Sequence, residues 1–245
     1  MSDHVRVRRV LLVALVAAAV AVAAFQAPEP APSPDLMTRF LARTENPLTQ
    51  YVAFRRLEAR NRRFKSRGWL EVRTEFDTQA GLRYTVVAEG GSSLIRHRVL
   101  RAALDAEAKL VNDGKASRVA ITQANYEFAP GADAADGHSR LLITPKRKDP
   151  LLVKGEIAVA MKDADILRLE GDLSATPSWW TTHVSVVRQY TRLAGVRVPT
   201  LTTSIAQIRI VGTSDFQMTY RYEMVNGQKV GDEQPGTPVH APEIP

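Results

Sequence analysis

The chain has 245 residues, a formal net charge of +7, five scattered histidines and no cysteine. The missing cysteines exclude a disulfide-stapled scaffold and a lipid-modified cysteine, and together with the scattered histidines they argue against a zinc site. We therefore expect no metal and no cofactor. Stability must come from a hydrophobic core, for which about 210 residues remain after the N-terminal segments.

The N-terminal residues have the pattern of an export signal. Arg6, Arg8 and Arg9 precede an apolar run over 10–24 that ends among small residues. This run is shorter than the ~20 residues that span a bilayer as a helix. We predict a signal peptide or an N-terminal anchor over 1–25. Either one places the remaining chain in the periplasm, free or anchored in the inner membrane.

Two further segments frame a single predicted domain over 35–229. Residues 26–34 alternate proline with other residues, which is typical of a stiff, extended spacer. Residues 230–245 combine prolines with glycine and charged residues, which is typical of a disordered tail.

The first part of the domain is predicted to be helical. Asp35 is placed to cap a short helix that ends near Leu41. Over 48–63, the spacing of Tyr51, Phe54 and Leu57 fits a second helix with basic residues on its other faces. The basic cluster indicates either a solvated face or a contact with lipid head groups or another anionic envelope component. The candidate anionic contacts are Arg55, Arg56, Arg62 and Arg63.

Alternation of polar and apolar residues predicts strands over most of the remaining chain. A β-hairpin is expected over 69–88, followed by a helix over 94–111 that Ser92 or Ser93 caps. Short connections favour an antiparallel meander, so the predicted class is α+β. The further strands are expected over 118–128, 139–145, 151–161, 165–173, 180–192, 196–210 with an interruption at Pro199, and 214–225, with a tight turn at Asn226 and Gly227.

The segment 216–224 carries the strongest apolar alternation. Phe216, Met218, Tyr220, Tyr222 and Met224 alternate with polar residues and are expected to share one face of a strand. This face is predicted to be either the floor of a groove that holds an acyl chain or part of an ordinary core filled by the helices. The candidate groove-lining residues are Leu70, Val72, Phe76, Leu167, Leu169, Phe216, Met218, Tyr220 and Tyr222.

Trp179 and Trp180 lie at the entrance of a predicted strand. One reading packs one indole in the core and the other on its rim. The other reading makes both a rim contact, either as an amphipathic lip of a hydrophobic cavity or as a membrane-facing surface.

The sequence contains no convincing catalytic constellation. Ser93 and His97 would share a helix face, but neither an orienting carboxylate nor a nucleophile elbow accompanies them. The preceding Gly90 and Gly91 are explained by a turn and a helix cap, without a phosphate-loop motif. We expect no enzyme. The export signal argues against a nucleic-acid partner despite the basic charge.

The segment 141–171 completes a pattern that resembles a known family. It reads Leu-Leu-Ile-Thr-Pro-Lys-Arg-Lys at 141–148, Leu-Leu-Val-Lys-Gly-Glu-Ile at 151–157 and Ile-Leu-Arg-Leu-Glu-Gly at 166–171. With the export signal, the hairpin and the run of strands, it resembles the outer-membrane lipoprotein-sorting superfamily: the periplasmic lipoprotein carrier, the lipoprotein receptor and the sensor domain of an anti-sigma regulator. The resemblance implies a curved antiparallel sheet over roughly 40–225 that forms a half-closed barrel, with helices packed on its concave side above a cavity for acyl chains.

Two functions from different classes follow from these features. The first is a periplasmic protein that binds lipid or lipoprotein acyl chains non-covalently, close to the membrane. The second is an envelope interaction or sensor module with a filled core and no small ligand, which docks an envelope protein partner. The size and lining of any cavity between sheet and helices discriminate between them.

Overall fold

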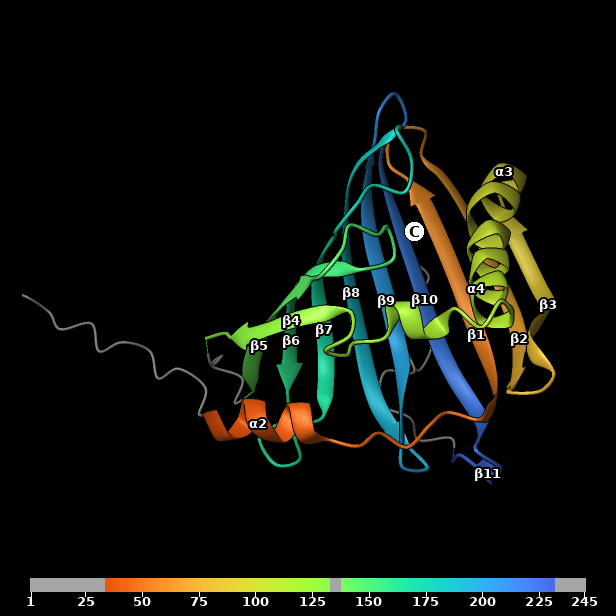
Figure 1. Ribbon diagram of the computed structural model, residues 1–245. Coiled ribbons are helices and arrows are strands. Elements are labelled where there is room, and N and C mark those ends of the chain that lie inside the picture. Colours follow the sequence, from red (N-terminus) through yellow and green to blue (C-terminus); the bar gives the residue numbers. More distant parts are fainter. Residues whose placement is uncertain (1–33, 133–137, 232–245) are drawn as a thin grey trace, which may run out of the picture. The chain divides into compact units, whose positions relative to one another are not determined.

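The computed structural model describes residues 34–132 and 138–231 (Figure 1). The predicted signal or anchor, nearly all of the Pro-rich spacer and the predicted tail after Gly231 lie outside these residues. Within them, one open antiparallel sheet of 11 strands carries packed helices, so the fold class is α+β. In these two ranges, no helix is long and apolar enough to cross a membrane.

The sheet is assembled from two meanders that meet in its middle. Antiparallel pairing of β1 with β10 joins them and gives the order β3-β2-β1-β10-β9-β8-β7-β6-β5-β4, so β10 is an interior strand. The first meander contains β1 (Gln50–Asn61), β2 (Ser66–Asp77) and β3 (Gly81–Gly91). The second contains β4 (Tyr126–Pro130), β5 (Ser139–Pro145), β6 (Val153–Val159), β7 (Ile166–Leu173), β8 (Thr181–Leu193), β9 (Val196–Ile208) and β10 (Gly212–Val225), and the short β11 (Gln228–Lys229) returns beside β10 after the predicted turn.

The helix predicted over 48–63 is wrong, because this segment forms strand β1. Tyr51, Ala53 and Leu57 face the core at alternate positions, as period two requires. Arg55 occupies the same face and is only 2% exposed. A charged residue at an inward position interrupts the apolar alternation, and this interruption makes the segment look helical.

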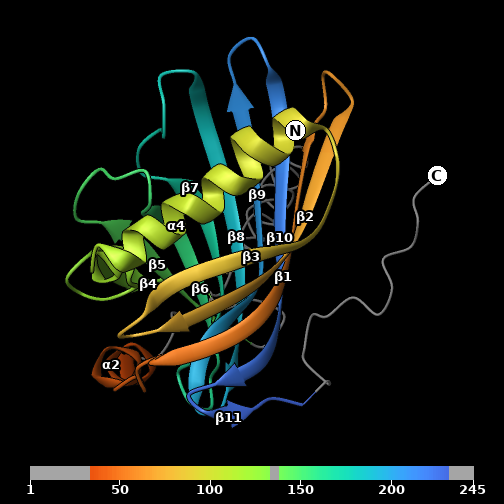
Figure 2. The ribbon, with the colours of Figure 1, turned by 90° about the vertical axis from the view of Figure 1, so that its right-hand side faces the viewer.

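The helix predicted over 94–111 is confirmed. It consists of α3 (Ser93–Ile95), the π-helical turn η1 (Arg96–Arg101) and α4 (Ala102–Asn112), and we call residues 93–112 the covering helix. The Ser92 hydroxyl accepts a hydrogen bond from the Ile95 N–H at 3.5 Å, which makes Ser92 the N-cap. Leu100 and Leu104 are buried in one core cluster with residues of β1 and β2. Figure 2 shows the covering helix lying across one face of the sheet.

A second core cluster lies beneath the N-terminal helix α2 (Pro34–Ala42). This helix begins at Pro34, so Asp35 lies in its first turn and not at the predicted cap position. Leu36 is fully buried in the cluster, and Phe40 packs edge-on against Phe128 with ring centroids 5.3 Å apart.

Two predicted strand segments differ in their bounds. Of the strand predicted over 118–128, only 126–128 lie in β4, and the residues before them belong to a 3-10 turn, η2 (Ala116–Val119), and a loop. The buried Asn125 side chain holds this loop by donating to the carbonyls of Ser117 and Ala120, both at 2.8 Å. Strand β9 runs through Pro199 without interruption. Its pairing with β10 begins only at Leu201, so no ladder bond to β10 is lost where proline lacks its N–H.

Candidate ligand-binding cavity

A cavity of about 1120 Å³ opens between the sheet and the covering helix. Its volume is at the upper end of the few hundred to about 1,000 Å³ that small-ligand sites occupy. Its lining is mostly apolar. The sheet contributes Leu169, Val184, Val186, Ala206, Ile208 and Phe216, and the covering helix contributes Leu94, Ile95, Val99 and Ala103.

Small inward side chains explain why the sheet leaves this space empty. In the sheet register, Ser204 of β9 lies between Val186 of β8 and Phe216 of β10. The next row places Ala206 beside Ser214. These small residues fill little volume above the middle strands, and the covering helix packs on β1, β2 and β3 instead. The hollow is therefore a consequence of residue size on the inward face of β9.

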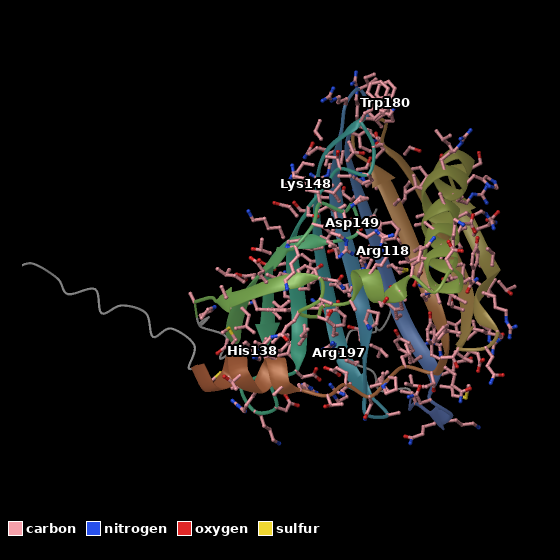
Figure 3. All side chains as sticks on the ribbon, in the orientation of Figure 1. Arg118, His138, Lys148, Asp149, Trp180 and Arg197 are labelled. Carbon is pink, nitrogen blue, oxygen red and sulfur yellow. The ribbon has the colours of Figure 1, made fainter. Side chains whose placement is uncertain are left out.

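The mouth of the cavity has an exposed apolar rim. Phe64, Leu94 and Leu151 line the cavity and are 61%, 68% and 52% exposed. Trp179 and Trp180 stand on the loop that enters β8, stacked with ring centroids 3.5 Å apart. Both are exposed, so neither indole packs in the core as one reading of the sequence expects. Figure 3 shows Trp180 at one end of the sheet and Arg197 toward the other.

The inner end of the cavity is polar and contains Arg188. Along β8 the lining runs Val184, Val186, Arg188, Tyr190, each step further from the tryptophan end. The Arg188 side chain lines the cavity and is exposed to solvent, although much of the protein lies around it. The neighbouring Tyr190 raises the pKa of Arg188, and burial opposes this rise. Arg188 therefore keeps its positive charge at neutral pH.

A second inward arginine, Arg55, is satisfied by protein partners. Its Nε donates to Thr74 Oγ1 at 2.9 Å, and its Nη1 pairs with Glu107 Oε2 on the covering helix at 2.7 Å. Burial alone would lower the pKa of Arg55, but the Glu107 carboxylate outweighs it and the pKa is raised. Arg55 thus ties the covering helix to the sheet and offers no free charge to a ligand.

Only two of the nine predicted groove-lining residues, Leu169 and Phe216, line this cavity. The other seven are placed elsewhere, so the prediction for them is corrected. Leu70, Val72 and Met218 pack with the covering helix, and Phe76, Tyr220 and Tyr222 belong to the core cluster around β1, β9 and β10. Leu167 falls at the irregularity in the β6–β7 register, which turns Ile166 and Leu169 inward.

The same kind of irregularity removes Met224 from the apolar face of β10. The register with β1 shifts between Val52 and Ala53, so Tyr222 and Val225 take the buried positions.

The predicted anionic contacts are held by partners within the protein. Arg56 pairs with Glu58 at 2.7 Å and also with Glu71, and Arg62 pairs with Asp215 at 2.6 Å. The remaining members are Arg55, which is buried, and Arg63, which donates to the carbonyl oxygen of Ile210.

A metal cluster and a Ser93–His97 pair are the two reactive sites that the sequence raises. Over 34–132 and 138–231, no group of three or more acidic or histidine side chains could hold a metal ion. Ser93 and His97 are both exposed, and no described carboxylate orients the imidazole.

The polar inner end is the feature that the sequence-based prediction misses. Arg188 interrupts the apolar series Val184, Val186, Tyr190 on β8, just as Arg55 interrupts that of β1. A charge at an inward position of an alternating strand is therefore the signal that could have located it.

The chain has no recognised relative among the proteins compared. No protein-family model matches it, and no curated protein matches it. A functional proposal therefore rests on the cavity itself.

Proposed function

We propose that this protein binds the acyl chains of a lipid or lipoprotein non-covalently in the cavity, as a periplasmic protein that works close to the membrane. The observation that carries the proposal is a mostly apolar cavity of about 1120 Å³ that is partly open to solvent. A polar small molecule would find few hydrogen-bond partners on this lining. A hydrocarbon chain removes the apolar lining from water, which contributes about 25 cal/mol of free energy per Å² of apolar surface buried.

We propose further that the sheet forms the half-closed barrel of the lipoprotein-sorting superfamily, with the covering helix on its concave side. The cavity lining supports this arrangement, because it includes Ala59 of β1 and Tyr126 of β4. In the strand order, β1 and β4 are seven steps apart. A flat sheet would separate them by roughly 34 Å at the usual strand spacing.

In this proposal the covering helix acts as the lid of the cavity. Polar contacts hold it to the sheet: Arg55 to Glu107, and Tyr84 to Asp105 at 2.6 Å. Burial and the Asp105 carboxylate raise the pKa of Tyr84 to about 12. The phenol therefore stays protonated and donates a hydrogen bond to the Asp105 carboxylate. Uptake and release would require these contacts to open, by partner binding or by a minor open state.

A cavity-filling variant tests the proposal. Ser204→Trp places an indole in the hollow, and we expect it to abolish uptake of a fluorescent fatty acid while the protein stays folded. The matched control is Thr203→Trp, whose side chain lies on the opposite face of the same strand. Uptake by the Ser204→Trp variant at the level of the control would contradict the proposal.

The second candidate is an envelope interaction or sensor module. The exposed, stacked pair Trp179 and Trp180 favours it, because such a pair is a natural anchor for a protein partner. Replacing both by serine would then abolish partner capture without any effect on fatty-acid uptake.

A further inference from the structure

Arg188 is the one inner-end cavity cation with no carboxylate partner among the residues that the structure describes. Arg197, which also lines the cavity, pairs with Glu45 at 2.9 Å and lies 3.5 Å from Asp165. The acidic group that acts on Arg188 most directly is Glu107, whose carboxylate is already bound by Arg55.

The hydrogen-bonding capacity of Arg188 is also largely unused. A guanidinium has five N–H donors, and the described side chain that accepts a hydrogen bond from Arg188 is the phenol of Tyr190. Thr202 of β9 lies opposite Arg188 in the β8–β9 register. The Thr202 hydroxyl is buried and makes no well-formed hydrogen bond to another described residue. Donors at the inner end of an apolar cavity are therefore left facing space that a ligand can fill.

The cavity lining as a whole carries a net positive charge, as Arg188 does. Four arginines and one aspartate face the cavity: Arg60, Arg98, Arg188, Arg197 and Asp215. Arg188 is exposed to solvent, so water can hydrate its charge while no ligand is bound. The missing counter-charge is the part that a ligand can bring.

We propose that the ligand is an anionic amphiphile whose carboxylate or phosphate group pairs with Arg188, while its hydrocarbon chain extends along the apolar lining toward the mouth. This inference rests on the proposed function and narrows its ligands from acyl chains in general to acidic lipids. The length available fits a chain, since Arg188 lies seven residues from the start of β8 at Thr181, roughly 23 Å at the rise of a strand.

Calorimetric titration with three probes of equal chain length tests the inference: oleate, 1-oleoyl lysophosphatidic acid and the neutral oleyl alcohol. We expect the folded wild-type protein to bind at least one acidic probe about tenfold or more tightly than the alcohol, because the acidic group forms charge-assisted hydrogen bonds with the Arg188 guanidinium. The tighter of the two acidic probes identifies carboxylate or phosphate as the preferred group.

Variants of Arg188 assign the effect to this side chain. Arg188→Leu should remove the preference for acidic probes and leave alcohol binding intact, and Arg188→Lys should retain part of the preference. The control Arg221→Leu, on the exposed face of β10, should keep it fully. A cooperative melting transition of ligand-free Arg188→Leu close to that of the wild type, as expected for an exposed side chain, shows that the variant folds.

The outcomes separate the two proposals. Equal binding of acidic and neutral probes, or a preference that survives in Arg188→Leu, would overturn the inference and leave acyl binding standing. Failure of all three probes to bind the wild-type protein would overturn the proposed function itself.

Discussion

Arg55 and Arg188 show how the same residue type can be structural in one place and available in another. Both occupy inward positions of a strand. Among the described residues, Arg55 finds a carboxylate and a hydroxyl, whereas Arg188 finds the phenol of Tyr190 and no carboxylate. The covering helix provides that carboxylate through Glu107. The difference between the two arginines therefore depends on which element packs above them, and not on their own strands.

The Arg55–Glu107 pair gives a direct test of this assignment. We expect Glu107→Gln to lower the free energy of unfolding by about 2 kcal/mol, because Arg55 stays buried after its counter-charge is removed. Urea denaturation of the two proteins measures the difference. The control Glu127→Gln changes an exposed carboxylate on β4 and should stay within about 0.5 kcal/mol. A Glu107→Gln variant as stable as this control would show that the pair does not hold the helix.

Asp165 makes part of the stability dependent on pH. Burial would raise the pKa of its carboxyl, but the hydrogen bond from Arg192 at 2.8 Å and the charges of Arg192, Arg43 and Arg197 outweigh burial and lower it. A carboxyl with a lowered folded-state pKa stabilises the protein above its unfolded pKa of about 3.9 and loses this effect as pH falls below that value.

The stability difference between wild type and Asp165→Asn should therefore be largest near pH 7 and shrink below about pH 4. Urea titrations at the two pH values measure it. The control Glu127→Gln, at an exposed carboxylate on β4, should alter stability by less than about 0.5 kcal/mol at either pH. A difference for Asp165→Asn that is constant or grows toward low pH would contradict the assignment of its pKa.

At the level of elements, β6 and β7 approach closely at a pair of glycines. Gly155 faces Gly171 across the ladder, and a Cβ added at Gly155 would come within 2.1 Å of the Glu170 carbonyl oxygen. We expect Gly155→Ala to force the strands apart and to cost about 2 kcal/mol in chemical denaturation. Gly231→Ala, where the added atom meets nothing within 4 Å, is the control and should be nearly neutral. Equal stability of the two variants would show that the close approach is unimportant.

Local sequence patterns predict most of the elements. The strand predicted over 139–145 coincides with β5, and the hairpin over 69–88 and the helix over 94–111 are found with small shifts of their ends. These segments have uninterrupted periodicity and clear turn residues. The prediction fails at 48–63, where Arg55 lies inward, and at 118–128, where the side chain of Asn125 supports a loop.

The cavity could be predicted only in part, because it depends on contacts between distant segments. The alternation in the sequence predicts the apolar face of β10. The pairing of β10 with β1 places Phe216 beside Ala59, which is 157 positions away in the chain, and no local pattern predicts that register. Two register irregularities also exchange the faces of Leu167 and Met224. The side chains that line the hollow follow from this long-range arrangement.

On the scale of the whole molecule, small residues on β9, a helix displaced toward β1–β3 and an exposed apolar rim combine into one apolar cavity. Arg188 lines this cavity, and no carboxylate of the described residues pairs with it. Core filling alone would not retain either feature.

The most direct test of acyl binding is native mass spectrometry of the protein purified from its own host without detergent. We expect a bound species with the mass of a lipid that is released on denaturation and is absent from Ser204→Trp. Protein that carries no lipid, and that also takes up no fluorescent fatty acid afterwards, would contradict it.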